Sequence, residues 1–268
     1  MLILSVFLTK TNLFYRTLWS IYFAISIGII GLVMGYGFTL PAYLLIMVTS
    51  PFPTLSLKIR HWTENIYCLS IRFLLLLQPW LQCTSNFQSI FSFYRSFSSR
   101  KILFVGNHRS NLDTFLLISF IPGLRGLAKQ SLFYNILFAP IMLLTGFVPV
   151  RKGSTESFLM GLEKIKEKIL NKNRSALVFP ENTRCEKNFS GLGKMTSSFF
   201  SLAIETKALV VPVAIHNSDA IMGRGDFLIY PGHVRIEMLP AIESTLYTSA
   251  KQLSQVVQSQ ILGALHEA

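Results

Sequence analysis

The sequence predicts an α/β fold, with a mixed sheet flanked by helices and an N-terminal hydrophobic membrane-embedded helical segment. Two observations carry this prediction. No charged residue and no histidine occurs between Arg16 and Lys58. From residue 101 onward, short apolar runs alternate with segments of helical spacing, the pattern of a sheet covered by helices. We therefore expect residues 1–83 to form a membrane-anchoring helical segment and residues 84–268 an α/β domain.

Composition favours a membrane protein with anionic ligands. Only 14% of the residues are charged, whereas roughly a quarter is usual in soluble domains. The formal net charge of +12 attracts anionic membrane surfaces, phosphorylated ligands or nucleic acid. Because the basic residues are spread along the chain without a nucleic-acid-binding module, we expect no nucleic-acid partner. Three scattered cysteines fit a reducing compartment and form neither a disulfide framework nor a metal cluster.

The N-terminal apolar region has two parts. The run from Leu18 to Met34 is close to the roughly 20 residues that a helix needs to cross a bilayer. A shorter apolar stretch, Ala42–Val48, follows after glycines and a proline. A re-entrant hairpin and a single span with an interfacial continuation both fit. Basic residues flank both sides, so the positive-inside rule does not select an orientation. A hairpin with both ends, and hence the α/β domain, at the cytoplasmic face accommodates them.

The remaining elements follow in order. Residues 62–81 are typical of an interfacial or packed helix, and residues 84–100, rich in Ser and Phe, of a linker. We expect strands at residues 102–105, 146–150, 176–179, 209–215 and 234–238. We expect helices at residues 111–120, 158–169 and 249–265.

The segment from Asn107 to Asp113 directly follows the first of these strands and carries the clearest chemistry. Ser110 and Asp113 have the spacing of a helix capping box, which places Asp113 in a first helical turn and His108 in the loop before it. The carboxylate can then fix the tautomer of the imidazole and make its other nitrogen a better base. Alternatively, Asp113 only caps the helix. A metal site needs a third ligand, and no other residue has recognisable ligand spacing.

Three further motifs follow this H-x-x-x-x-D block in order: Gly146-Phe-Val-Pro-Val-Arg151, Phe179-Pro180-Glu181-Asn182-Thr183-Arg184 and Val211-Pro212-Val213-Ala214-Ile215. Together the four blocks, over roughly residues 101–215, resemble those of the 1-acyl-sn-glycerol-3-phosphate acyltransferase family, the glycerolipid acyltransferases. Four blocks in the right order are far more specific than any one of them.

The resemblance assigns a role to each matching residue. His108 suits the general base for an acceptor hydroxyl, and Asp113 the residue that orients it. Guanidinium groups at two of the blocks match phosphate oxygens in geometry. The expected substrate-binding residues are Arg151, Arg184, Lys129 as an added point charge, and Glu181, which positions an acceptor hydroxyl or holds an arginine. Gly146, Thr183 and Pro212 are expected to be structural.

The implied reaction transfers a fatty acyl group from acyl-CoA or acyl-carrier protein to the sn-2 hydroxyl of lysophosphatidic acid, forming phosphatidic acid for phospholipid synthesis. No metal or bound cofactor is implied. Asn182 stands where the family usually has Gly, which keeps another lysophospholipid acceptor open. A non-catalytic membrane protein that binds anionic headgroups is the alternative from a different class.

Overall fold

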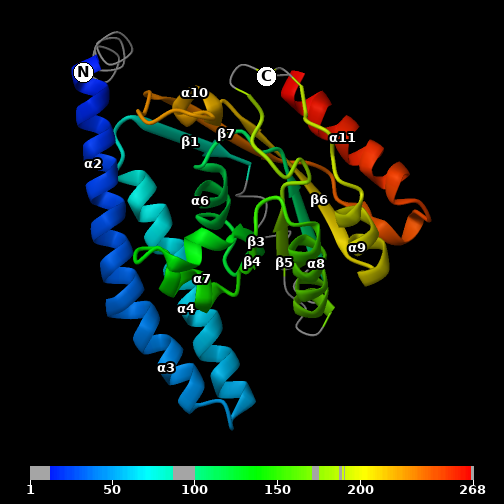
Figure 1. The fold of residues 1–268 in the computed structure, drawn as a ribbon, viewed down its shortest axis with the longest axis horizontal. Coiled ribbons are helices and arrows are strands. Elements are labelled where there is room, and N and C mark those ends of the chain that lie inside the picture. Colours follow the sequence, from blue (N-terminus) through cyan, green and yellow to red (C-terminus); the bar gives the residue numbers. More distant parts are fainter. Residues whose placement is uncertain (1–12, 87–99, 171–174, 187–188, 190, 267–268) are drawn as a thin grey trace.

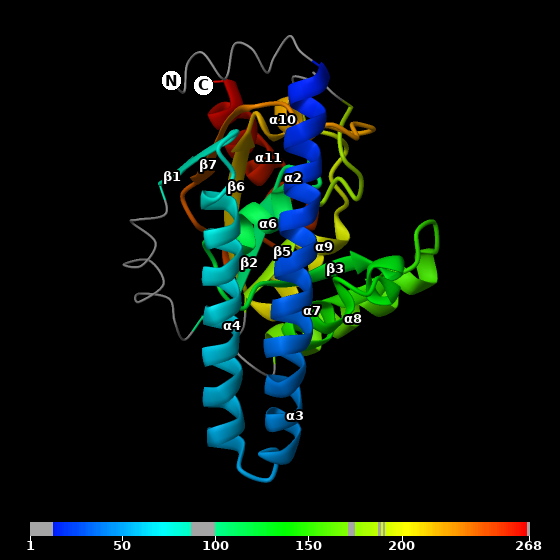
Figure 2. The same ribbon diagram turned by 90° about the vertical axis from the view of Figure 1, so that its left-hand side faces the viewer.

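A helical hairpin opens the part of the chain that this computed structural model describes, namely residues 13–86, 100–170, 175–186, 189 and 191–266. Helix α2 (Leu13–Leu32) continues through the π-helical η1 (Val33–Thr39) into α3 (Leu40–Val48). Helix α4 (Pro53–Leu76) then runs back beside them, as Figure 2 shows. The expected re-entrant hairpin within residues 18–48 was wrong, because both apolar stretches lie in one continuous helical arm, Leu13–Val48, and the arm that runs back is α4.

The first arm of the hairpin is a candidate membrane span. Its 36 residues, Leu13–Val48, have a mean hydropathy of 2.0, and only 17% of the most apolar window is buried. At 1.5 Å per residue the arm is about 54 Å long, which exceeds the roughly 30 Å of a bilayer core. The expected association with a membrane is therefore supported by length and composition.

The sheet has eight strands in the order β1-β7-β6-β2-β5-β3-β4, with β8 paired to β6. Strand β2 pairs parallel with β5 and β6, β3 pairs parallel with β5 and β4, and β1 pairs parallel with β7. Strand β6 pairs antiparallel with β7 and β8, so the predicted mixed sheet is confirmed. The strands are β1 (Leu81–Ser85), β2 (Ile102–Gly106), β3 (Arg125–Lys129), β4 (Val148–Val150), β5 (Ser175–Val178), β6 (Leu209–His216), β7 (Gly232–Met238) and β8 (Ile242–Glu243).

Helices cover both faces of the sheet (Figure 1). In β2, Ile102 and Phe104 join the core that includes α4 and α6, whereas Leu103 and Val105 join the core under α8, α9 and α11. A strand buried on both faces is apolar throughout, which explains why β2 appears as a continuous hydrophobic run. The further helices are α6 (Asp113–Ile118), η3 (Gln130–Tyr134), α7 (Ala139–Thr145), α8 (Thr155–Leu170), α9 (Ser198–Thr206), α10 (Ser218–Met222), η4 (Ser244–Leu246) and α11 (Ala250–His266).

Several predicted boundaries were wrong. The helix expected at residues 111–120 is the shorter α6, and the helix expected at residues 62–81 is α4, which begins at Pro53 and ends at Leu76. The strand expected from Gly146 begins at Val148, because Gly146 has a φ of 74° and ends α7 in the left-handed conformation.

The expected linker at residues 84–100 was partly wrong. Thr84 and Ser85 belong to β1 and pair in register with Arg235 and Ile236 of β7. Residues 87–99 of the expected linker lie outside the described residues. The predicted boundary between residues 83 and 84 falls within strand β1. The division into a membrane-anchoring segment and an α/β domain stays a prediction.

The hairpin packs firmly on the α/β part of the chain. Tyr67 and Ile71 of α4 are buried in the same core as Phe104. Next to them, Glu64 of α4 forms a buried ion pair with Arg125 at the start of β3; the two side chains are only 4% and 3% exposed. A buried charge is tolerated only with a partner, so this pair fixes α4 against the sheet.

Candidate active site

The predicted site residues gather at one edge of the sheet. His108 follows the carboxyl end of β2, Glu181 follows β5 and Arg151 follows β4, while Lys129 is the last residue of β3. These four strands are parallel neighbours, so their carboxyl ends point to the same side. Ligands of open α/β sheets bind at this edge.

His108 and Asp113 form a hydrogen-bonded pair. Nδ1 of His108 lies 2.9 Å from Oδ2 of Asp113, and Asp113 is fully buried. The same oxygen accepts hydrogen bonds from the backbone N–H groups of Arg109 at 2.7 Å and Ser110 at 2.8 Å. Asp113 therefore holds the loop before α6 and orients the imidazole at once, so the alternative that it only caps the helix was wrong.

The expected capping box was wrong, because the N-cap residue of α6 is Leu112 and no side chain caps the helix. The carboxylate of Asp113 reaches back to the N–H of Ser110 as expected. The Ser110 hydroxyl, however, accepts from the N–H of Leu112 at 3.1 Å and donates to the carbonyl of Met222 at 2.6 Å. It thereby ties the start of α6 to the end of α10.

The environment of the His108 ring suits a base. A carboxylate accepts only from a protonated nitrogen, so the contact with Asp113 places the proton on Nδ1 and leaves the lone pair on Nε2. The side chain is 22% exposed, and its ring stacks on Phe179 with the centroids 4.3 Å apart. Nε2 is thus the nitrogen available to a substrate hydroxyl.

Glu181 contacts the protein backbone with both oxygens. Oε1 accepts from the backbone N–H of His108 at 3.0 Å, and Oε2 accepts from the N–H of Gly193 at 2.7 Å and from the Cys185 thiol at 2.6 Å. The residue is 8% exposed. The arrangement favours a role in holding the backbone of His108, which differs from both contacts expected for Glu181 from the sequence.

The turn after Glu181 has the conformation that the family's glycine would adopt. Asn182 has a φ of 55°, a left-handed conformation that Asn tolerates better than other non-glycine residues. Its Nδ2 donates to Oγ1 of Thr196 at 2.6 Å. Thr183 is exposed and Arg184 is half-buried, with the Arg184 carbonyl accepting from Arg224 at 3.5 Å.

The remaining predicted residues lie along the same sheet. Lys129 is exposed and stands opposite Val150 in the β3–β4 register, so Arg151 follows directly beyond it. Arg151 is also exposed. Pro212 is buried within β6 opposite Val105 of β2, and its carbonyl accepts from Leu239 at 3.0 Å.

Three residues of this network were not predicted from the sequence. Asn107 makes a double hydrogen bond with the backbone of Ile215 in β6, at 2.9 and 2.7 Å. Arg109 contacts Asp219 of α10. Cys185 donates its backbone N–H to the carbonyl of His108 at 3.0 Å. Two of them flank the histidine, but a single sequence does not show that their partners lie more than 70 residues away.

The thiol of Cys185 is held in its neutral form. Burial raises the pKa of Cys185 to about 11, and the hydrogen bond to Glu181 acts in the same direction. A thiol with so high a pKa is a poor nucleophile at neutral pH. The arrangement therefore gives Cys185 the part of a hydrogen-bond donor.

Metal-ligand groups and apolar grooves are the other places where a protein of this kind could bind a ligand. Among the described residues, no group of three or more His, Cys, Asp and Glu side chains is placed to hold a metal ion. Two open apolar grooves, of about 480 and 390 Å³, lie between the helices of the hairpin and are lined by hairpin residues. The polar chemistry is concentrated at the sheet edge.

Comparison with known proteins agrees with this geometry. Residues 85–216 match the family model described as Acyltransferase. The chain is 23% identical to a 1-acyl-sn-glycerol-3-phosphate acyltransferase of Limnanthes alba, over 58% of this chain and 54% of the relative. It is 26% identical to the enzyme so named from Pseudomonas aeruginosa, over 52% and 53% of the two chains. The chain spans about half the length of the curated relatives it matches.

A solved structure shares the fold. The crystal structure of the 1-acyl-sn-glycerophosphate acyltransferase PlsC from Thermotoga maritima superposes with a TM-score of 0.70 at 17% identity, covering 94% of this chain and 97% of that one. The family match spans the four sequence blocks, and the structural match extends over the hairpin as well. Residues 85–216, which contain all four blocks, therefore belong to the Acyltransferase family that this model describes.

Proposed function

We propose that this protein is a membrane-bound acyltransferase that acylates the sn-2 hydroxyl of 1-acyl-sn-glycerol-3-phosphate and forms phosphatidic acid. The observation that carries the proposal is the contact of 2.9 Å between His108 and the buried Asp113. Acyl-CoA or acyl-carrier protein is the donor, and no metal or bound cofactor takes part. The names of the relatives support the choice of acceptor.

The pair performs the reaction in one direct transfer. Nε2 of His108 removes the proton of the acceptor hydroxyl while the hydroxyl oxygen attacks the thioester carbonyl. The new C–O bond forms, the C–S bond breaks, and the proton passes from the imidazolium to the departing sulfur. Asp113 stabilises the imidazolium that forms in between. The acceptor oxygen is itself the nucleophile, so no covalent acyl-enzyme is needed.

Basic residues at the same edge suit the phosphate of the acceptor. Arg184 and Arg151 offer planar guanidinium groups, and Lys129 adds a point charge. The apolar hairpin keeps the site at the membrane, where an amphipathic acceptor resides, and we propose that the catalytic domain faces the cytoplasm.

The test compares purified wild type with His108→Ala and Asp113→Asn, using lysophosphatidic acid and an acyl thioester. We expect turnover by wild type and a loss of roughly 100-fold or more in both variants, because a mis-set tautomer alone costs about 10⁴ in the serine-protease precedent. Equal turnover by all three proteins contradicts the mechanism. Turnover only with other lysolipids contradicts the choice of acceptor, and no turnover with any acceptor favours a lipid-binding protein.

A further inference from the structure

Arg109 is a buried cation beside the catalytic histidine that the proposed mechanism does not use. Its side chain is only 10% exposed. Burying a guanidinium is costly unless hydrogen bonds and charge compensate for the lost water. Because Arg109 stands next to His108, its guanidinium is a candidate for binding the acceptor phosphate. The groups that the guanidinium contacts decide between this role and a role within the protein.

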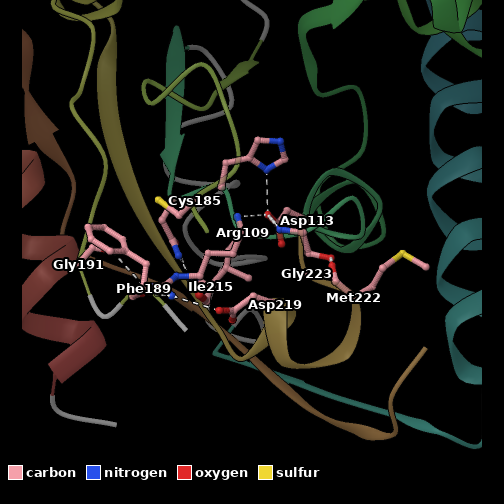
Figure 3. Close-up of polar contacts among 12 residues, drawn as sticks. Arg109, Asp113, Cys185, Phe189, Gly191, Ile215, Asp219, Met222 and Gly223 are labelled. Carbon is pink, nitrogen blue, oxygen red and sulfur yellow. Dashed lines mark hydrogen bonds and ion pairs between the residues drawn. The ribbon is translucent and has the colours of Figure 1, made fainter. Parts of the chain in front are cut away.

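The guanidinium is engaged with the protein itself. Nη1 donates to the carbonyl of Phe189 at 2.6 Å and lies 3.4 Å from Oδ2 of Asp219. Nη2 donates to the carbonyl of Gly191 at 3.1 Å. Figure 3 shows these partners converging on Arg109 from two sides, with Asp219 on α10 and the two carbonyls on the segment after the third motif.

That segment in turn holds the backbone of His108. The N–H of Cys185 donates to the His108 carbonyl at 3.0 Å. Gly193 and the Cys185 thiol hold Oε2 of Glu181, whose Oε1 accepts from the His108 N–H. Both backbone polar groups of His108 are therefore anchored, to Glu181 and Cys185, and Arg109 holds the same part of the chain at Phe189 and Gly191.

We infer that Arg109 is a positioning residue: its guanidinium fastens the segment that contains Phe189 and Gly191 onto the loop of His108 and thereby sets the position of His108. Asp113 fixes the tautomer and direction of the ring, whereas Arg109 acts through the backbone that carries the ring. Its ligands are backbone carbonyls and Asp219 rather than a substrate phosphate. The catalytic part of this inference rests on the proposed function.

Arginine is the residue that this position requires. Two carbonyls on one segment and a carboxylate on another lie around a planar fork, which supplies several donors in fixed directions. Lysine keeps the charge but presents a compact ammonium that cannot reach the same acceptors together. The variant Arg109→Lys thus separates loss of geometry from loss of charge.

The kinetic test uses Arg109→Lys, Arg109→Gln and Asp219→Asn. A matched control is Arg100→Gln. Arg100 lies just before the start of β2, at the end of the strand away from His108, and its two Nη atoms lie 2.6 and 2.5 Å from the carboxylate oxygens of Glu243. We expect both Arg109 variants to lower kcat by roughly 10- to 100-fold, since small displacements of catalytic groups have such effects, with KM for lysophosphatidic acid nearly unchanged. Asp219→Asn should lower kcat less, and the control should change neither parameter.

A second readout does not depend on activity. Loosening the segment should expose Cys185, so its labelling by N-ethylmaleimide, followed by mass spectrometry, should become at least several-fold faster in Arg109→Gln, with the labelling of Cys83 as the internal reference. If the wild type proves inactive, the proposed function fails. The labelling rate of Cys185 still tests whether Arg109 holds the segment.

Three results would overturn the inference. A raised KM with unchanged kcat would assign Arg109 to phosphate binding. Unchanged kcat and KM in variants with a lower Tm would make its role structural only. An unchanged labelling rate of Cys185 would show that Arg109 does not hold the segment.

Discussion

Oε1 of Glu181 lies 3.0 Å from the backbone nitrogen of His108, so the carboxylate of the third motif supports His108 through its main chain. The other oxygen of Glu181 accepts from Gly193 and Cys185. All three partners are donors, and a carboxylate is an acceptor only. The charge of Glu181 thus holds together two stretches of chain that are about 70 residues apart.

Replacing Glu181 by Gln should impair catalysis without preventing folding. One of the two oxygens becomes an NH₂ group and then faces an N–H or a thiol, which leaves buried donors unpaired at roughly 1–3 kcal/mol. We expect kcat to fall by about 10- to 100-fold, measured with saturating acceptor. Glu163→Gln, on the exposed face of α8, is the control. A Glu181→Gln variant with wild-type kcat would contradict this role.

We expect the fold to require the left-handed backbone conformation of Asn182 and not its side chain. Asn182→Gly removes the bond to Thr196 but keeps a residue that adopts positive φ freely. Asn182→Val places a β-branched side chain at a φ of 55°, which costs about 1–2 kcal/mol. We expect Asn182→Gly to retain Tm and the preference between lysophosphatidic acid and lysophosphatidylcholine, and Asn182→Val to lower Tm. A shifted acceptor preference in Asn182→Gly would instead give the amide a part in specificity.

Cys185 should react slowly with alkylating agents at neutral pH. The pKa of Cys185 is raised to about 11 from an ordinary value of 9.0, chiefly by burial. Its neutral form is thus favoured in the folded state, so the stability it contributes is complete below pH 9 and declines as pH rises towards 11. Labelling rates followed by mass spectrometry should increase through pH 10–11, while a free cysteine levels off near its own pKa. A midpoint at or below pH 9 would contradict the assignment.

Two glycines provide a matched test of packing. A Cβ atom at Gly126 in β3 would lie 2.6 Å from the carbonyl oxygen of Leu177 in β5, whereas at Gly263 in α11 nothing lies within 4 Å. Gly126→Ala should destabilise the protein by about 1–3 kcal/mol, and Gly263→Ala should stabilise it by about 0.5–1 kcal/mol. Thermal unfolding in detergent measures both. Equal Tm values for Gly126→Ala and the wild type would show that β3 and β5 are not packed as described.

The sequence was sufficient to predict the central strands and the contact between His108 and Asp113. Strands β2, β5 and β6 are buried on both faces and therefore appear as apolar runs. His108 and Asp113 are five residues apart, so local backbone geometry decides their contact. Both kinds of feature depend on short-range information.

Other features depended on distant partners. Strand β1 contains polar residues and forms only because β7 offers a partner. Arg125 looks like a surface charge until Glu64 of α4 is placed beside it. The burial of Arg109 depends on residues 80 to 110 positions away. A single sequence carries no local signal for such pairs.

The pairing of β1 with β7 imposes an order on the assembly of the protein. Leu81 stands directly after the hairpin, and its partner Gly232 lies about 150 residues further along the chain. During synthesis the hairpin can insert into a bilayer long before Gly232 leaves the ribosome. Until then β1 is an unpaired edge, and loop closure over so long a stretch is slow. The edge of the sheet next to the hairpin is therefore completed late, after the strands β2 to β6 that lie between these two partners in the chain.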